Sequence, residues 1–224
     1  MNVKFKENFG HTKPILPLKE SGKIICANAT RINWEEVCPK KEGDEIYILG
    51  NPPYLGARYQ EDIHRKDIAN LLSNIKGHKT IDYISCWFFK GVDYVKKSNT
   101  KLAFVSTNSI CQGEQLSNIW KPIFENEIEI FFAHQSFKWQ NNAKSNAGVC
   151  VVIIGLQNKS NNPKILYSKD SHIKTANINA NLVASKNVFI EKKNSPISDF
   201  TKITRTNPAL DDGYLLLTPQ EKEE

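Results

Sequence analysis

The stretch that decides the fold is Ile46-Tyr47-Ile48-Leu49-Gly50-Asn51-Pro52-Pro53-Tyr54, an apolar run that leads straight into a rigid turn. Prolines fix φ and remove backbone donors, and each residue before a proline is pushed out of the α region. The sequence therefore predicts a strand over residues 45–49, followed by a turn that aims the Asn51 amide in one direction.

Four residues of this turn, Asn51, Pro52, Pro53 and Tyr54, are typical of a catalytic site that methylates an exocyclic amine. The Asn51 amide oxygen and the Pro52 carbonyl can act as two neighbouring acceptors. Two acceptors suit an NH2 group whose nitrogen must free its lone pair and carry growing positive charge during methyl transfer. Tyr54 can stack on the ring that bears the amine. The alternative is an ordinary turn, because Asn-Pro is a common turn initiator, but the preceding strand favours the catalytic interpretation.

The composition narrows the class of protein. The chain has 224 residues, 40% of them hydrophobic, and a net charge of +6, which is compatible with a polyanionic partner. The five cysteines and five histidines are scattered and no CxxC occurs, so we expect reduced thiols, a cytoplasmic location and no metal site. No apolar run has the length of a signal peptide or of a membrane span, so no membrane partner is expected.

The hydrophobic pattern predicts an α/β protein with a mostly parallel sheet, because strands alternate with helices. A helix is expected over 62–76, and a second, capped by Thr80, should carry Ile81, Ile84, Phe88 and Val95 on one face. A short helix should follow Gly113, and the last two strands should form an antiparallel pair at one edge. Strands are predicted at 23–26, 45–49, 101–106, 127–133 and 149–156.

Several motifs in the same order resemble the γ-type adenine-N6 DNA methyltransferases. More narrowly, the chain is similar to the methyltransferase region of MmeI-like fused restriction–modification enzymes of types IIL and IIG. The likeness covers roughly residues 20 to 220. The motifs are Cys26-Ala27-Asn28-Ala29-Thr30-Arg31-Ile32-Asn33-Trp34, the stretch 48–56, the stretch 103–110, Phe132-Ala133-His134-Gln135-Ser136-Phe137-Lys138-Trp139 with its continuation to Gly155, and Asp211-Asp212-Gly213-Tyr214-Leu215-Leu216-Leu217.

The resemblance implies methyl transfer from S-adenosylmethionine to an adenine extruded from double-stranded DNA. It places Asn28 against the adenine ring of the cofactor, with Asn51 also beside the cofactor, and Asn51 and Pro52 on the target amine. Tyr54 would stack on the flipped base, and Phe137 and Trp139 would form a second stacking wall. The alternatives are a turn residue for Asn28 and core packing for the two aromatic residues, although their polar neighbours favour a loop. Residues 58–60 could contact DNA phosphate or form a solvated loop.

One departure from the family concerns the glycine-rich loop that should cradle the cofactor, since no G-x-G occurs in the chain. The strand ending at Cys26 would be the third of the family's sheet. We therefore expect a partial Rossmann-like class I methyltransferase fold with its first two strands missing. The expected organisation is an irregular segment 1–22, the C-terminal half of a catalytic domain over 23–200, and a junction into a target-recognition domain over 201–224. Such a fragment should be inactive without the N-terminal half of the same enzyme.

Two other functions remain open from the sequence. The same Asn-Pro-Pro-Tyr chemistry also serves methylation of a glutamine side chain in a protein, or of another amine. A non-catalytic remnant that only binds DNA is the third interpretation. The aromatic segment 134–142 and the junction at 211–217 favour a DNA substrate over a protein substrate.

Overall fold

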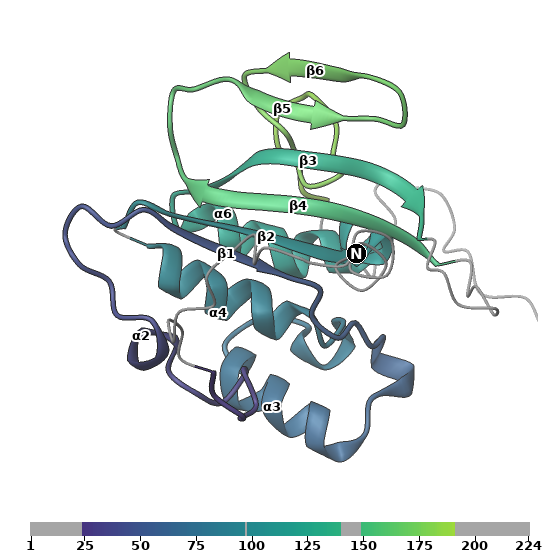
Figure 1. Cartoon of the computed structure of the whole chain (residues 1–224). Coiled ribbons are helices and arrows are strands. Elements are labelled where there is room, and N and C mark those ends of the chain that lie inside the picture. The colour runs from purple at the N-terminus through teal and green to yellow at the C-terminus, as the bar shows by residue number, and fades with distance from the viewer. Residues whose placement is uncertain (1–23, 97, 140–148, 191–224) are drawn as a thin grey trace, which may run out of the picture. The chain divides into compact units, whose positions relative to one another are not determined.

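The computed structural model describes residues 24–96, 98–139 and 149–190, which lie in one compact unit, Met1–Ile190. The expected segment 1–22 and junction 201–224 lie outside the described residues. The unit contains a six-stranded sheet in the order β1-β2-β4-β3-β5-β6 (Figure 1). The strands are β1 (Ile46–Gly50), β2 (Thr100–Thr107), β3 (Ile128–Lys138), β4 (Cys150–Asn158), β5 (Lys164–Tyr167) and β6 (His172–Thr175).

Four of the six strands run in one direction, which confirms the predicted α/β sheet with an antiparallel edge. β1 pairs parallel with β2, and β3 pairs parallel with β5. β4 lies antiparallel between β2 and β3, and β6 is the antiparallel edge strand. The antiparallel pairing of β3 with β4 is therefore confirmed, but the pair lies inside the sheet, because β5 and β6 extend it beyond β3.

Helices α4 (Ser85–Val95) and α6 (Lys121–Glu125) pack on one face of this sheet, and α3 (Asp62–Leu72) packs against α4 (Figure 1). Their apolar side chains meet alternate residues of the strands, among them Leu102, Phe104, Ile154 and Leu156, which are all buried. The helical segments are α2 (Trp34–Val37), η1 (Ala57–Tyr59), α3 (Asp62–Leu72), η2 (His78–Thr80), α4 (Ser85–Val95), η3 (Asn108–Cys111), α5 (Gly113–Gln115), the π-helix η4 (Leu116–Trp120) and α6 (Lys121–Glu125).

The opposite face of the sheet is much less covered by the described residues. Tyr47 is 56% exposed and Leu49 is 78% exposed. Nearer the middle of the sheet, the rings of Phe131 and Phe132 lie over Gly155. Mostly parallel sheets normally have both faces buried, so within the described residues this face departs from the usual arrangement.

The strand predicted at 23–26 is wrong for the residues that are described. Residues 24–26 have no regular secondary structure, and Ile24 is 98% exposed. The physical reason is that a strand is held by its neighbours. Among the described residues, β1 pairs only with β2, and nothing lies beside residues 24–26 to form a ladder.

The helix predictions are correct in position but differ at their ends. α3 stops at Leu72 rather than at residue 76, and the segment after Gly113 continues through η4 and α6. Thr80 is not a helix cap, because its hydroxyl donates to the Gly77 carbonyl and α4 begins only at Ser85. β5 and β6 were not predicted, because they are four residues each within a polar stretch.

Candidate active site

The Asn51-Pro52-Pro53-Tyr54 loop leaves the sheet at the carboxyl end of β1. Gly50, the last residue of β1, lies opposite Phe104 of the parallel strand β2. Open α/β sheets bind their ligands outside the carboxyl ends of parallel strands. The predicted catalytic loop therefore lies where this class of sheet places its sites.

The four loop residues differ in their exposure. Pro52 is buried and Tyr54 is half-buried, with its side chain against the hydrophobic core. Asn51 and Pro53 are exposed, and the Asn51 amide makes no hydrogen bond to any described residue. The loop thus presents a free carboxamide on a backbone that two prolines make rigid.

The residue directly after the loop, Leu55, is fixed through its backbone. Its N–H donates to the Asp82 carboxylate at 2.8 Å. Its carbonyl accepts from the Tyr83 N–H at 3.0 Å and from the Gln60 side chain at 2.9 Å. Gln60 is buried and also donates to the Ile81 carbonyl, so it is not available to DNA, whereas Arg58 and Tyr59 are exposed.

Asp82 is buried, and burial raises the pKa of its carboxyl, although backbone hydrogen bonds from Ile84 and Leu55 oppose this effect. Asp82 was not singled out in the sequence analysis. A polar residue within an apolar stretch, between Ile81 and Ile84, is the one signal that could have marked it.

The predicted cofactor residue Asn28 has its side chain engaged inside the protein. Its Oδ1 accepts from the Thr30 N–H at 2.9 Å and from the Thr30 hydroxyl at 2.8 Å. Its Nδ2 donates to Asp67 at 3.3 Å. Asn28 therefore forms a turn, as the alternative interpretation held, and a contact with a cofactor would require some of these bonds to be exchanged. Its cofactor role stays a prediction.

Asp67 is a buried acid that the sequence analysis did not single out. It accepts from the Arg31 Nε at 2.8 Å and from the Tyr83 hydroxyl at 2.7 Å, in addition to Asn28. Burial by itself raises the pKa of Asp67, but the hydrogen bonds from Arg31 and Tyr83 outweigh it, so the pKa lies below its usual value. Since Tyr83 also holds Leu55, the side chain and backbone of one residue connect the Asn28 turn to the loop.

Phe137 and Trp139 lie at the end of β3 rather than in a loop. Phe137 pairs with Val151, and the Trp139 N–H continues the ladder to the Val149 carbonyl. Both side chains are half-buried, and their ring centroids are 6.5 Å apart. β3 is three strand positions from β1, or about 14 Å at the usual strand spacing. The two aromatics thus share an edge of the sheet with the loop, and their stacking role stays a prediction.

Comparison with known proteins places this geometry in a family. Residues 1–168 match the family described as "MmeI, DNA-methyltransferase domain". This chain belongs to that family. It is 44% identical over 225 residues to "DNA methyltransferase A" of Bacillus subtilis (strain 168), which covers 99% of the chain and 25% of the relative. The solved structure of the Type IIL restriction-modification enzyme MmeI in complex with DNA matches with a TM-score of 0.81 and 37% identity. That match covers 99% of this chain and 30% of the MmeI chain, so the chain spans about a quarter to a third of the relatives' length.

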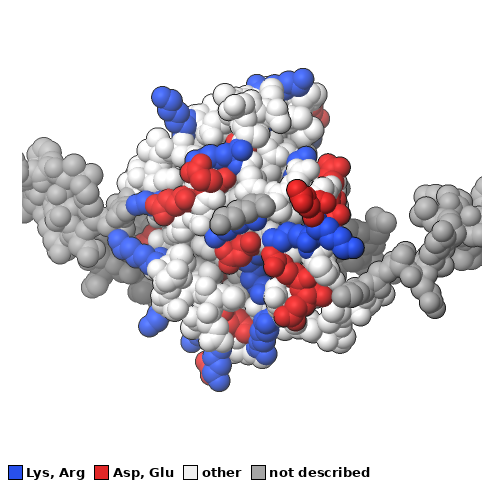
Figure 2. All heavy atoms as spheres, turned by 90° about the vertical axis from the view of Figure 1, so that its left-hand side faces the viewer, with Lys and Arg blue, Asp and Glu red and all other residues white. Residues whose placement is uncertain are grey.

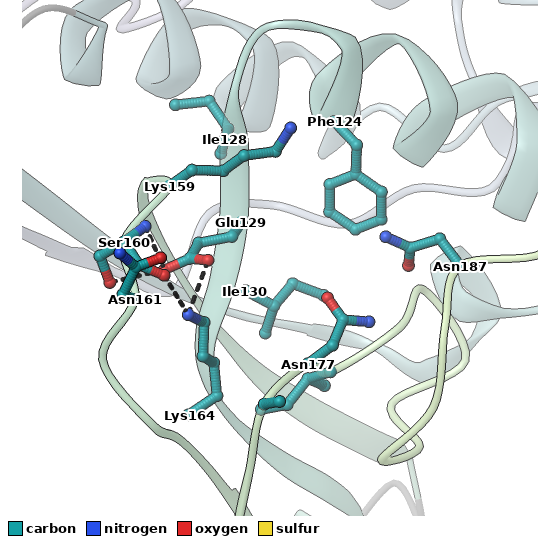
Figure 3. A pocket seen from close by; sticks show the side chains of 12 residues that line it. Phe124, Ile128, Glu129, Ile130, Lys159, Ser160, Asn161, Lys164, Asn177 and Asn187 are labelled. Atoms are coloured by element: carbon teal, nitrogen blue, oxygen red, sulfur yellow. Dashed lines mark hydrogen bonds and ion pairs between the residues drawn. The ribbon is translucent and has the colours of Figure 1, made fainter.

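A pocket of about 410 Å³ in this MmeI-type chain lies away from the Asn51 loop (Figure 3). It is at the amino end of β3, where Lys164 and Glu129 form a buried ion pair at 2.9 Å. The Lys164 ammonium also donates to the carbonyls of Ser160 and Asn162. Each of these bonds is internal, so the pair has a structural role in joining β3 to the start of β5.

Charge is mixed on the end of the molecule that faces the viewer in Figure 2, where Lys and Arg are interspersed with Asp and Glu. This is the end opposite the Asn51 loop.

Among the described residues, no helix has both the length and the apolar composition to span a membrane. In the same residues, His, Cys, Asp and Glu side chains form no cluster of three or more that could hold a metal ion.

Proposed function

We propose that this chain supplies the base-holding half of a site-specific DNA adenine-N6 methyltransferase. The observation that carries the proposal is the exposed Asn51 carboxamide, which has no hydrogen-bond partner among the described residues, on a rigid Pro-Pro loop at the carboxyl end of β1. In the proposed reaction, S-adenosylmethionine supplies the methyl group, and the acceptor is the exocyclic amine of an adenine flipped out of double-stranded DNA.

The loop would act by holding the amine from one side. The Asn51 Oδ1 and the Pro52 carbonyl would each accept one N–H of the target NH2 group, which orients the amine and keeps its lone pair available on nitrogen. The positive charge that grows on nitrogen is stabilised by the same two dipoles, which are already oriented before the reaction. The ring of Tyr54 would stack on the adenine and replace part of the stacking that is lost on extrusion.

The described residues do not form a complete site for the cofactor. Asn28 has both polar side-chain atoms engaged by Thr30 and Asp67, and no G-x-G occurs anywhere in the chain. We therefore propose that most of the contacts to S-adenosylmethionine come from outside this chain.

The unpaired edge of β1 and the exposed face beside it support the proposal that a further half of the same enzyme is a partner of this chain. β1 pairs on one side only within the described residues, and its side chains Tyr47 and Leu49 are exposed. An unpaired apolar strand is a liability for aggregation in an isolated protein. A neighbouring strand beside β1, with helices over the open face, would bury these residues and complete a doubly covered sheet.

The test replaces Asn51 by alanine in a polypeptide that joins this chain to the remaining parts of a family member. Methyl transfer from tritiated S-adenosylmethionine to duplex DNA should fall below detection, while DNA affinity changes little, because phosphate contacts supply most of it. Asn70→Ala, at an exposed position of α3, is the matched control and should be fully active. Turnover of Asn51→Ala within tenfold of wild type would refute the assignment, and wild-type binding of DNA without methyl transfer would favour a non-catalytic remnant.

A further inference from the structure

The carboxyl end of the candidate catalytic loop is attached through the backbone of Leu55. Both of its backbone polar groups are held by a segment that is far away in sequence. The Asp82 carboxylate accepts the Leu55 N–H at 2.8 Å, and the Leu55 carbonyl accepts from the Tyr83 N–H at 3.0 Å. A change in the position of Asp82 would therefore move the backbone next to Tyr54.

Asp82 is itself fixed by contacts to two helical segments. Its Oδ1 also accepts the Ile84 N–H at 3.1 Å, just before α4 begins. Its own N–H donates to the Gln115 side chain of α5 at 2.9 Å. The side chain is buried, with only 3% of the residue exposed. The carboxylate thus joins the loop to the layer of helices rather than to solvent.

The amino end of the loop is held independently by the sheet, where Gly50 pairs in register with Phe104. Between the two attachments lie only Asn51, Pro52, Pro53 and Tyr54, and the prolines remove most of the freedom of that segment. Loss of the Asp82 bond would leave the Leu55 N–H without its acceptor, so that the carboxyl end of the loop is held only at the Leu55 carbonyl, by Tyr83 and Gln60.

We propose that Asp82 is a positioning residue that holds the Asn51–Tyr54 loop in the geometry required for methyl transfer, through its hydrogen bond to the Leu55 N–H. The proposal rests on the function proposed above. The competing explanation is local: a carboxylate that accepts from the N–H two residues later also stabilises the start of a helix, with no effect on the loop.

Three substitutions of Asp82 separate these two roles. Asp82→Asn keeps an oxygen acceptor at the same reach, so it can retain the bonds to both Leu55 and Ile84. Asp82→Ser has a hydroxyl that can still accept from the N–H of Ile84, as serine does in turns, but its side chain is one atom too short to keep the longer-range contact with Leu55. Asp82→Ala loses both bonds. Leu156→Ala, buried in β4 away from the loop, is the control for general loss of stability.

Two measurements are made on each variant. Amide hydrogen exchange of Leu55 is measured in the 224-residue chain, and kcat and KM for duplex DNA are measured in the joined polypeptide described above. Asp82→Ser and Asp82→Ala should both speed Leu55 exchange and lower kcat by roughly 10- to 100-fold, since a displacement of about 1 Å in a reacting group can cost that much. KM for DNA should stay within about threefold of the wild-type value. Asp82→Asn should show wild-type Leu55 exchange and wild-type kcat.

The outcomes that overturn the proposal are distinct from those that overturn the function. If the wild-type polypeptide is active and Asp82→Ser has wild-type kcat, Asp82 only stabilises the start of α4. If Leu156→Ala lowers kcat as much as Asp82→Ala does, the effect is general destabilisation. A wild-type polypeptide that folds, binds DNA and transfers no methyl group would refute the proposed function itself, and this inference with it.

Discussion

Replacing Asp67 by asparagine tests the buried polar cluster that links the Asn28 turn to α3 and to Tyr83. Asp67 accepts four hydrogen bonds from three side chains: two from Arg31, one from Tyr83 and one from Asn28. Asparagine has nearly the same shape but only one oxygen. Its NH2 group must therefore face at least one donor, and the negative charge opposite Arg31 is lost.

The expected cost follows from the orientation that asparagine would adopt. Its oxygen should take the place of Oδ2, which serves Tyr83, Asn28 and one nitrogen of Arg31, and its NH2 group should then face the Arg31 Nε. One hydrogen bond is lost and another no longer involves two charges. Arg31 is 51% exposed, so water can solvate the freed guanidinium and limit the penalty. We expect a loss of about 2 kcal/mol in the free energy of unfolding at pH 7.

The assay is urea unfolding of the chain between pH 7 and pH 3. The folded-state pKa of Asp67 is lowered, so its stabilisation is present above the unfolded pKa of about 3.9 and is lost as pH falls through the lower folded value. The difference between wild type and Asp67→Asn should therefore shrink below about pH 4. Asp93→Asn, in an exposed ion pair with Lys96, is the control and should change stability by less than about 0.5 kcal/mol. A cost for Asp67→Asn that is equally large at pH 3 and pH 7 would refute the electrostatic explanation.

Three further predictions concern the base, the cofactor and the open face of the sheet. When 2-aminopurine replaces the target adenine in duplex DNA bound to the joined polypeptide, Phe137→Ala or Trp139→Ala should change the fluorescence of the flipped base, because base–aromatic stacking is worth about 1–3 kcal/mol. No change in either variant would make both residues structural. Isothermal titration of the 224-residue chain with S-adenosylmethionine should show no binding at micromolar concentrations, and a dissociation constant of a few micromolar would contradict the incomplete site. Gly155→Ala should destabilise by about 1–3 kcal/mol, because its Cβ would lie 2.2 Å from the ring of Phe132, whereas Gly56→Ala, with no atom within 4 Å, should be neutral in the same unfolding assay.

The sequence predicted the parts of the fold that depend on local pattern. The apolar runs that became β1, β2, β3 and β4 are long or rich in β-branched residues, and the Pro-Pro turn marked the end of β1. The parts that failed depend on neighbours. Residues 24–26 have the composition of a strand but no partner among the described residues. β5 and β6 have only four residues each, and they are held by pairing, β5 with β3 and β6 with β5.

The candidate site also contains residues that can be recognised from local sequence and residues that depend on distant neighbours. The residues that were missed belong to the second group. Asn51, Pro52, Pro53 and Tyr54 are adjacent in sequence, so their joint chemistry can be recognised from the sequence alone. Their support comes from Asp82, 27 residues beyond Leu55. The Asn28 turn depends in the same way on Asp67, 39 residues further along the chain. An acid acquires such a role only when folding removes it from water and brings backbone or side-chain donors to it, since an unpaired buried carboxylate would be unstable.

The pKa values of the two carboxyl groups shift in opposite directions. At Asp82 the backbone hydrogen bonds do not offset the effect of burial, so the pKa is raised. At Asp67 the hydrogen bonds from Arg31 and Tyr83 outweigh burial, so the pKa is lowered. The two acids therefore differ in what holds them, and only Asp67 should lose its stabilising effect when the pH falls below about 4.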